Sequence, residues 1–199
     1  MLGAVFLGNM LYLTRMTAQI TFKPKPDKLV ETMLYLSLKE MELDQYKMVK
    51  LLYLADREHL RRFGRPITFD KYVAMPFGPV ASAAFDLLKG RKALGVDPST
   101  LPFEMRNHDK IVIVDHPKRD IDRSVFSKSD LMVLDQIAEK YGDMSFDQLY
   151  KLTHEHFAYD RAWKSRKTKA DEMRFEDFLA EDASKESRVS DLSFTCKGM

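Results

Sequence analysis

The stretch from Asp44 to Gly64 constrains the fold most, because it combines one long amphipathic pattern with signals for both ends of a helix. Its mainly apolar positions recur at helical spacing and fall on one broad arc, which predicts a central and largely buried helix. These positions are Met48, Val49, Leu51, Leu52, Ala55, His59, Leu60 and Phe63. Asp44 suits the N-cap, Gly64 suits the C-terminal stop, and Pro66 forces Arg65 into extended backbone. A short strand or corner is expected next, at residues 67–69.

Asp56 falls inside this apolar arc, where an unpaired carboxylate would be costly. It therefore needs hydrogen-bond donors, either from the corner around Arg65 or from the entrance of a second helix at residues 78–81. Gly78 suits the cap of that second helix, and Pro79 suits its first position. The open N–H groups of such an entrance would bind an anion.

The opposite face of the central helix carries a basic stripe. Lys50, Arg57 and Arg61 line up there, with Leu54 among them. This pattern has two interpretations. The stripe is either a solvated face with one exposed apolar residue, or a contact surface that Phe77 extends near the second helix entrance. Both interpretations stay open from the sequence, and we take the second as the hypothesis for partner binding.

Helical periodicity and capping residues predict further helices at residues 27–41, 79–90, 127–142, 145–157 and 175–179. Residues 101–106 and 111–114 flank a polar turn, which predicts a β-hairpin, and residues 20–22 suit a short edge strand. The sequence therefore predicts a mainly α fold of the α+β class, a compact bundle of five or six helices with one small β-hairpin.

Composition and the two chain ends bound the organisation. With 199 residues, 45% of them hydrophobic, the chain can form one compact core, and its formal net charge of +2 gives no broad positive field. We interpret residues 1–22 as an extension with Met16 as the true start, because the apolar stretch 2–13 is too short for a bilayer and lacks signal-peptide features. Residues 23–180 form the expected domain, and the polar residues 181–199 form an expected disordered tail.

No common catalytic or phosphate-binding motif occurs in the chain, so we expect neither enzyme activity nor a cofactor. The single cysteine, Cys196, excludes an internal disulfide and a site built from several cysteines, and it favours a cytoplasmic location with no membrane partner. His154 and His156 suggest a metal site only weakly, because residues two apart on a helix face different directions. The basic run at residues 161–169 contains Trp163, a composition that suits either nucleic acid or a solvated helix end.

Several of these segments together resemble one known family. They are Lys50-Leu51-Leu52-Tyr53-Leu54-Ala55, Gly64-Arg65-Pro66, Ala74 and Gly78-Pro79-Val80. In this order they are similar to the SocA-like Panacea antitoxin domain. The similarity extends from about Pro26 to Trp163. We assign Tyr53, Asp56, Gly64, Pro66, Gly78 and Pro79 to its structural motif.

The resemblance implies a mainly helical antitoxin that neutralises a toxin encoded beside it by direct protein binding, in phage-associated or bacterial toxin–antitoxin pairs. In some relatives the antitoxin delivers the toxin to an ATP-dependent protease. The family supplies no catalytic residues to transfer. Two alternatives remain: a nucleic-acid-binding transcriptional regulator that uses Lys50, Arg57, Arg61 and residues 161–169, and an enzyme with a site around Tyr53, Asp56 and His59.

Overall fold

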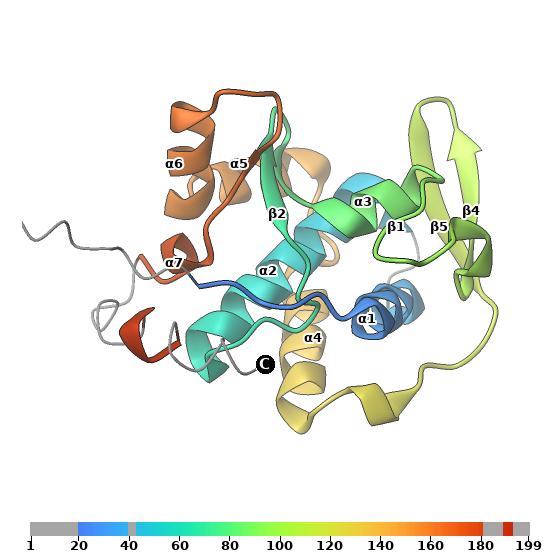
Figure 1. Cartoon of the computed structure of the whole chain (residues 1–199). Coiled ribbons are helices and arrows are strands. Elements are labelled where there is room, and N and C mark those ends of the chain that lie inside the picture. Colours follow the sequence, from blue (N-terminus) through green and yellow to red (C-terminus); the bar gives the residue numbers. More distant parts are fainter. Residues whose placement is uncertain (1–19, 40–42, 181–188, 193–199) are drawn as a thin grey trace, which may run out of the picture.

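Helix α2 (Gln45–Phe63) forms the centre of the molecule in the computed structural model, which describes residues 20–39, 43–180 and 189–192 (Figure 1). The Asp44 carboxylate accepts a hydrogen bond of 2.8 Å from the N–H of Lys47 and caps the helix. Gly64 ends it with φ of 75° and an N–H bond to the Leu60 carbonyl. Both predicted ends are therefore confirmed.

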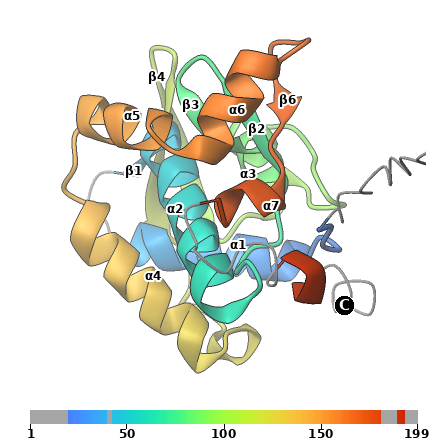
Figure 2. The same cartoon turned by 90° about the vertical axis from the view of Figure 1, so that its left-hand side faces the viewer.

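Other helices surround α2. Their bounds are α1 (Pro26–Lys39), α3 (Ser82–Leu88), α4 (Lys128–Tyr141), α5 (Phe146–His154), α6 (Phe157–Ser165) and α7 (Phe175–Phe178). Two short 3-10 turns, η1 (Pro98–Thr100) and η2 (Arg123–Val125), lie in the connections. The predicted caps Ser127 and Ser145 each form a complete capping box, while the helix predicted at residues 145–157 is divided into α5 and α6. Figure 2 shows α4 beside α2 and α5 across the N-terminal end of α2.

Two small antiparallel sheets complete the fold, where the sequence predicted one hairpin. One sheet has the order β1-β5-β4, from strands Leu43–Asp44, Ile111–Pro117 and Phe103–His108. The other has the order β3-β2-β6, from strands Gly78–Ala81, Tyr72–Met75 and Asp171–Glu172. The predicted β4–β5 hairpin is present, and the mainly helical α+β class is confirmed. The description as a bundle with a single hairpin is wrong, because β2 and β3 form a second one.

The predicted helix entrance at Gly78 and Pro79 is wrong as well. These residues belong to strand β3, in which Pro79 faces Ala74 and Gly78 faces Met75 across the hairpin. Proline fits there because β3 is an edge strand, where a residue without an N–H can be accommodated. Helix α3 begins only at Ser82, where the carboxylate of Asp70 accepts from the N–H groups of Ala83 and Ala84 at 3.0 Å each.

The core reaches beyond the predicted domain boundary at residue 23. Ile20 and Phe22 are buried, and the Ile20 N–H donates to Glu176 at 2.5 Å, although residues 20–22 form no strand. Within the predicted tail, residues 189–192 form a helical turn, and Leu192 packs on the core. Met16 and the remaining tail positions lie outside the described residues. None of the described helices is long and apolar enough to cross a bilayer.

Candidate functional site

The predicted basic stripe of α2 is not an exposed surface. Lys50 and Leu54 are only 2% and 4% exposed, whereas Arg57 and Arg61 are partly buried. All nine residues from Met48 to Asp56 are buried, so over more than two turns α2 has no solvent face. Of the five residues predicted to bind the partner, Phe77 alone is exposed, at 52%.

Arg57 and Arg61 lie far along α2 from Phe77, in the half that packs beside α4. Arg57 borders a pocket shared with Leu54 and with Tyr141 at the end of α4. Arg61 lies 4.0 Å from Glu58, one turn earlier on the same helix. The structure therefore does not join the five predicted residues into one patch.

Lys50 instead lies beneath the β2–β3 hairpin. Its Nζ donates to the Pro79 carbonyl at 2.9 Å, and a Cβ placed on Gly78 would come within 2.6 Å of this nitrogen. Gly78 has φ of 99°, a conformation that side chains rarely adopt. Glycine at this position thus permits both the turn and the close approach of the lysine. Burial lowers the pKa of Lys50 to about 7.

Three aromatic rings gather above Lys50, and we call them the aromatic triad: Tyr46, Phe77 and Phe146. They come from α2, from the β2–β3 turn and from the first turn of α5. The centroid distances are 6.1 Å for Tyr46–Phe77, 5.6 Å for Tyr46–Phe146 and 6.0 Å for Phe77–Phe146, all edge to face. Phe146 is 44% exposed, so the triad offers a substantial apolar surface to solvent.

Further rings continue this surface along α5 and α6. Tyr150 lies next to Phe146, and His154 stacks on Tyr150 with centroids 3.7 Å apart. On α6, Trp163 stacks on Tyr159, and the Arg166 guanidinium lies 3.6 Å from the centre of the Trp163 ring. Phe146, Tyr150 and His154 recur every four residues, which places them on one face of α5. This spacing is visible in the sequence, although the predicted partner-binding residues do not include these rings.

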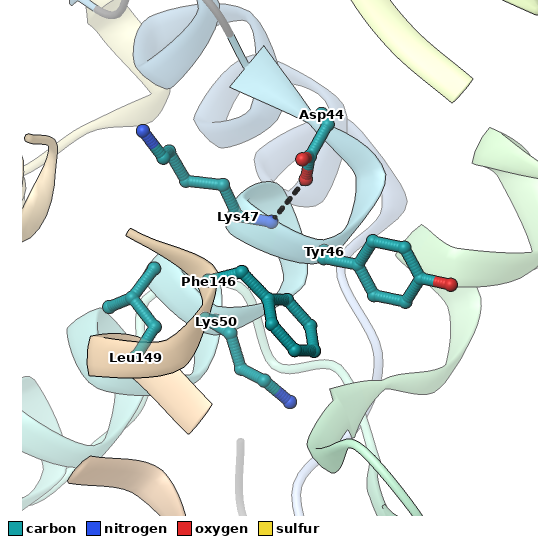
Figure 3. Close-up of a pocket in the computed structure, with 6 residues that line it drawn as sticks. All are labelled: Asp44, Tyr46, Lys47, Lys50, Phe146 and Leu149. Atoms are coloured by element: carbon teal, nitrogen blue, oxygen red, sulfur yellow. Dashed lines mark hydrogen bonds between the residues drawn. The ribbon is translucent and has the colours of Figure 1, made fainter. Parts of the chain in front are cut away.

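A small pocket opens between two rings of the triad, Tyr46 and Phe146, and Lys50 (Figure 3). It is lined by Asp44, Tyr46, Lys47, Lys50, Phe146 and Leu149 and has a volume of about 30 Å³. Figure 3 shows Lys47 pointing away from Tyr46, and its Nζ donates to the Gly142 carbonyl at 2.7 Å. Lys50 is therefore the buried cation of this pocket, while Lys47 has its acceptor elsewhere.

The residues assigned to the structural motif have roles in folding. Asp56 accepts from Ile67 N–H at 2.7 Å, from both the N–H and the hydroxyl of Thr68, and from Tyr72 hydroxyl at 2.8 Å. The corner after Pro66 therefore supplies its partners, as one of the two expectations stated, and residues 78–81 do not. Burial raises the pKa of Asp56, and these hydrogen bonds oppose that rise.

Tyr53, Asp56 and His59 do not converge on a shared site. All three are fully buried, and their bonds go to separate partners. The Tyr53 hydroxyl lies 3.2 Å from Nδ1 of His156, and Nδ1 of His59 lies 2.7 Å from the Arg65 carbonyl. The arrangement gives no support to the enzyme alternative.

His59 belongs to a second buried group centred on Asp130 of α4. The Asp130 carboxylate lies 2.6 Å from Lys28 Nζ, 3.1 Å from His59 and 2.9 Å from Arg65. Burial alone would raise the pKa of Asp130, but His59, Lys28 and the N–H of Ser127 hold it well below its usual range. This group ties α1, α2 and α4 together.

The predicted metal site and the basic run at residues 161–169 do not form a shared site either. His154 lies beside the carbonyls of Tyr150 and Pro76, and no group of three metal-binding side chains occurs in the described part of the chain. Within the basic run, Arg161 pairs with Asp177 and Lys164 pairs with Asp160 at 2.9 Å. Trp163 is partly buried against the core, as expected for a solvated helix end.

Fold and site together define a small α+β domain, built around one buried helix, that displays an exposed group of aromatic rings. Residues 48–164 match the family described as antitoxin SocA-like, Panacea domain, and the chain belongs to this family. No curated protein and no solved structure matches the chain.

Proposed function

We propose that this protein is an antitoxin that neutralises a cognate toxin by binding it directly through the surface of Tyr46, Phe77, Phe146 and Tyr150. Membership of the antitoxin family supports the class of function. The exposed aromatic triad is the observation that carries the choice of surface, because large exposed apolar patches mark interaction sites and aromatic anchors dominate binding energy. Enzyme activity forms no part of this proposal.

The nucleic-acid alternative receives less support from the geometry. It relied on Lys50, which is buried, and on Arg57 and Arg61, which are partly buried. Its only exposed cations are those of residues 161–169, of which two pair with carboxylates and Arg166 lies over the Trp163 ring. A nucleic-acid site needs several solvent-facing cations that follow a phosphate backbone. We therefore place protein binding first.

The test begins with the genes beside the coding sequence, each expressed under an inducible promoter to find the one that arrests growth. The wild-type antitoxin should restore growth, and the double variant Phe77→Ala with Phe146→Ala should fail to do so. Its circular dichroism spectrum should match the wild type, since both rings are about half exposed.

Leu94→Ser with Ile111→Ser is the matched control, because these side chains are 39% and 37% exposed but lie outside the aromatic surface. Growth rescue by the triad variant, or equal failure of the control, would move the interface elsewhere. Toxin half-life measured during rescue separates simple inhibition from delivery to an ATP-dependent protease, since only delivery shortens it.

A further inference from the structure

The buried ammonium of Lys50 has unused binding capacity. An ammonium group carries three N–H donors, and Lys50 directs one of them to the Pro79 carbonyl. Among the described residues, no carboxylate lies within ion-pair distance of it. Asp44 shares its pocket but caps α2, and the two residues are six positions apart along the helix, a rise of about 9 Å.

An unpaired buried cation does not benefit the fold. Moving a charge from water into an apolar site is unfavourable unless an opposite charge and hydrogen bonds compensate it. An apolar side chain of similar length would fill the space between Phe146 and Leu149 without this penalty. A lysine at this position therefore needs a reason outside folding.

The pocket supplies a place for the missing anion. Its volume of about 30 Å³ matches one or two water molecules, which is also the scale of a carboxylate group. The rings of Tyr46 and Phe146 form two of its walls, so an apolar residue next to the carboxylate would contact the triad.

We infer that Lys50 is the recognition point for an acidic side chain of the partner protein, inserted between Tyr46 and Phe146 and flanked by apolar residues. This inference rests on the proposed function, because the partner is the toxin. The carboxylate takes the donors of Lys50 that the fold leaves free, and its flanking residues pack on the triad. Charge complementarity thus selects an acidic–apolar segment.

Binding then includes proton uptake. Burial holds the pKa of free Lys50 at about 7, so above pH 7 the ammonium must be regenerated before it pairs with the carboxylate. The other titratable groups near Lys50 are Asp44 at the end of β1, Tyr46 and Lys47 on α2, and His154 on α5. His154 titrates below its usual 6.5, because burial lowers its pKa, and so it stays neutral in this range. Affinity should therefore fall above pH 7 through Lys50.

The test uses 3-phenylpropionate, a carboxylate with an aromatic tail, as the probe on the full chain with lysine ε-carbons and the Phe and Tyr rings labelled for NMR. The probe should shift the Phe146, Tyr46 and Lys50 signals and raise the pKa of Lys50 by about one unit or more. Its affinity at pH 9 should be about tenfold or more below that at pH 7. The uncharged 3-phenylpropionamide should leave these signals unchanged.

Lys50→Met should abolish these shifts, and Lys151→Met, which removes the same charge at an exposed position of α5 outside the pocket lining, should retain them. Equal binding of acid and amide, an unchanged Lys50 pKa at saturation, or equal binding by Lys50→Met would overturn the inference. The probe experiment needs no toxin. Failure of the probe together with growth rescue by the wild type rejects the Lys50 contact alone, whereas failure of rescue rejects the proposed function.

Discussion

At position 50, the aliphatic part of the lysine packs beside Phe146 and Leu149 while its nitrogen meets one carbonyl oxygen. Burial lowers its pKa from 10.5 to about 7. The unfolded chain therefore binds more protons than the folded chain between these two values, and the free energy of unfolding rises with pH across this window. Below pH 7 the full penalty of the buried charge acts on the fold.

Lys50→Met should consequently stabilise the protein, by roughly 1–4 kcal/mol near pH 6, because it replaces a buried cation with an apolar side chain of similar shape. The advantage over the wild type should shrink by on the order of 3 kcal/mol as the pH rises from 6 to 10, since the wild type then loses its charge. Denaturant unfolding at several pH values measures both effects. A destabilised Lys50→Met variant, or an advantage independent of pH, would contradict this account. Lys47→Met, which leaves Lys50 in place, serves as the control.

At the scale of single elements, the β2–β3 hairpin decides the geometry of the site. Its turn at Pro76 and Phe77 presents Phe77 to solvent, and Gly78 lets the backbone pass over Lys50. The Tyr159 hydroxyl, which donates to the Met75 carbonyl at 2.9 Å, fixes the hairpin to α6. The positions of the triad and of the buried lysine are therefore coupled through one short turn.

Gly78→Ala should destabilise the fold by about 2–3 kcal/mol, because it combines an unfavourable φ of 99° with a Cβ 2.6 Å from Lys50 Nζ and 3.0 Å from Thr153 Oγ1. Gly90→Ala should cost only about 1 kcal/mol, because Gly90 shares the positive φ, at 72°, but has open space around it. Thermal unfolding of the two variants compares them directly. Equal losses would show that the close approach to Lys50 contributes nothing.

The elements themselves were predictable to different degrees. Helices with a local cap, such as those that begin after Asp44, Ser127 and Ser145, follow from the sequence because cap and helix are neighbours in the chain. The start of α3 was not predictable in this way, since its N–H groups bind the carboxylate of Asp70, more than ten residues earlier. Gly78 and Pro79 carry a helix-start pattern, but pairing with β2 placed them in a strand.

At the scale of the whole molecule, the burial of α2 explains why the residues predicted for the interface do not form one exposed patch. A helical wheel assigns one face of a helix to the core and the other to solvent. Helices α1, α3, α4 and α5 and strand β3 all contact α2, so the stripe of Lys50 and Leu54 became interior. Which residues of the site are exposed depends on this packing, and no local pattern encodes it. Phe77 is exposed because it lies in the turn between β2 and β3.

The core also extends past the region that defines the family. Phe175 and Phe178 follow the matched residues 48–164 and lie in an aromatic group with Tyr53 and Tyr72. The ring centroid of Phe178 lies 5.4 Å from that of Tyr53 and 5.6 Å from that of Tyr72. Phe22 joins this group from the other end, 5.0 Å from Phe175. The segments before and after the matched region therefore close one core together.

Phe178→Ala should destabilise the protein by about 3–5 kcal/mol, the usual cost of removing a fully buried ring, although it lies outside the matched region. Ile111→Ala, at an exposed position of the β4–β5 hairpin, should stay within about 0.5 kcal/mol of the wild type. A chain limited to residues 48–164 lacks α1, Phe22 and α7 and should show no cooperative thermal transition by circular dichroism. Cooperative melting of that fragment near the wild-type temperature would mean that the matched region forms a complete core alone, and that the flanking aromatic residues only cover it.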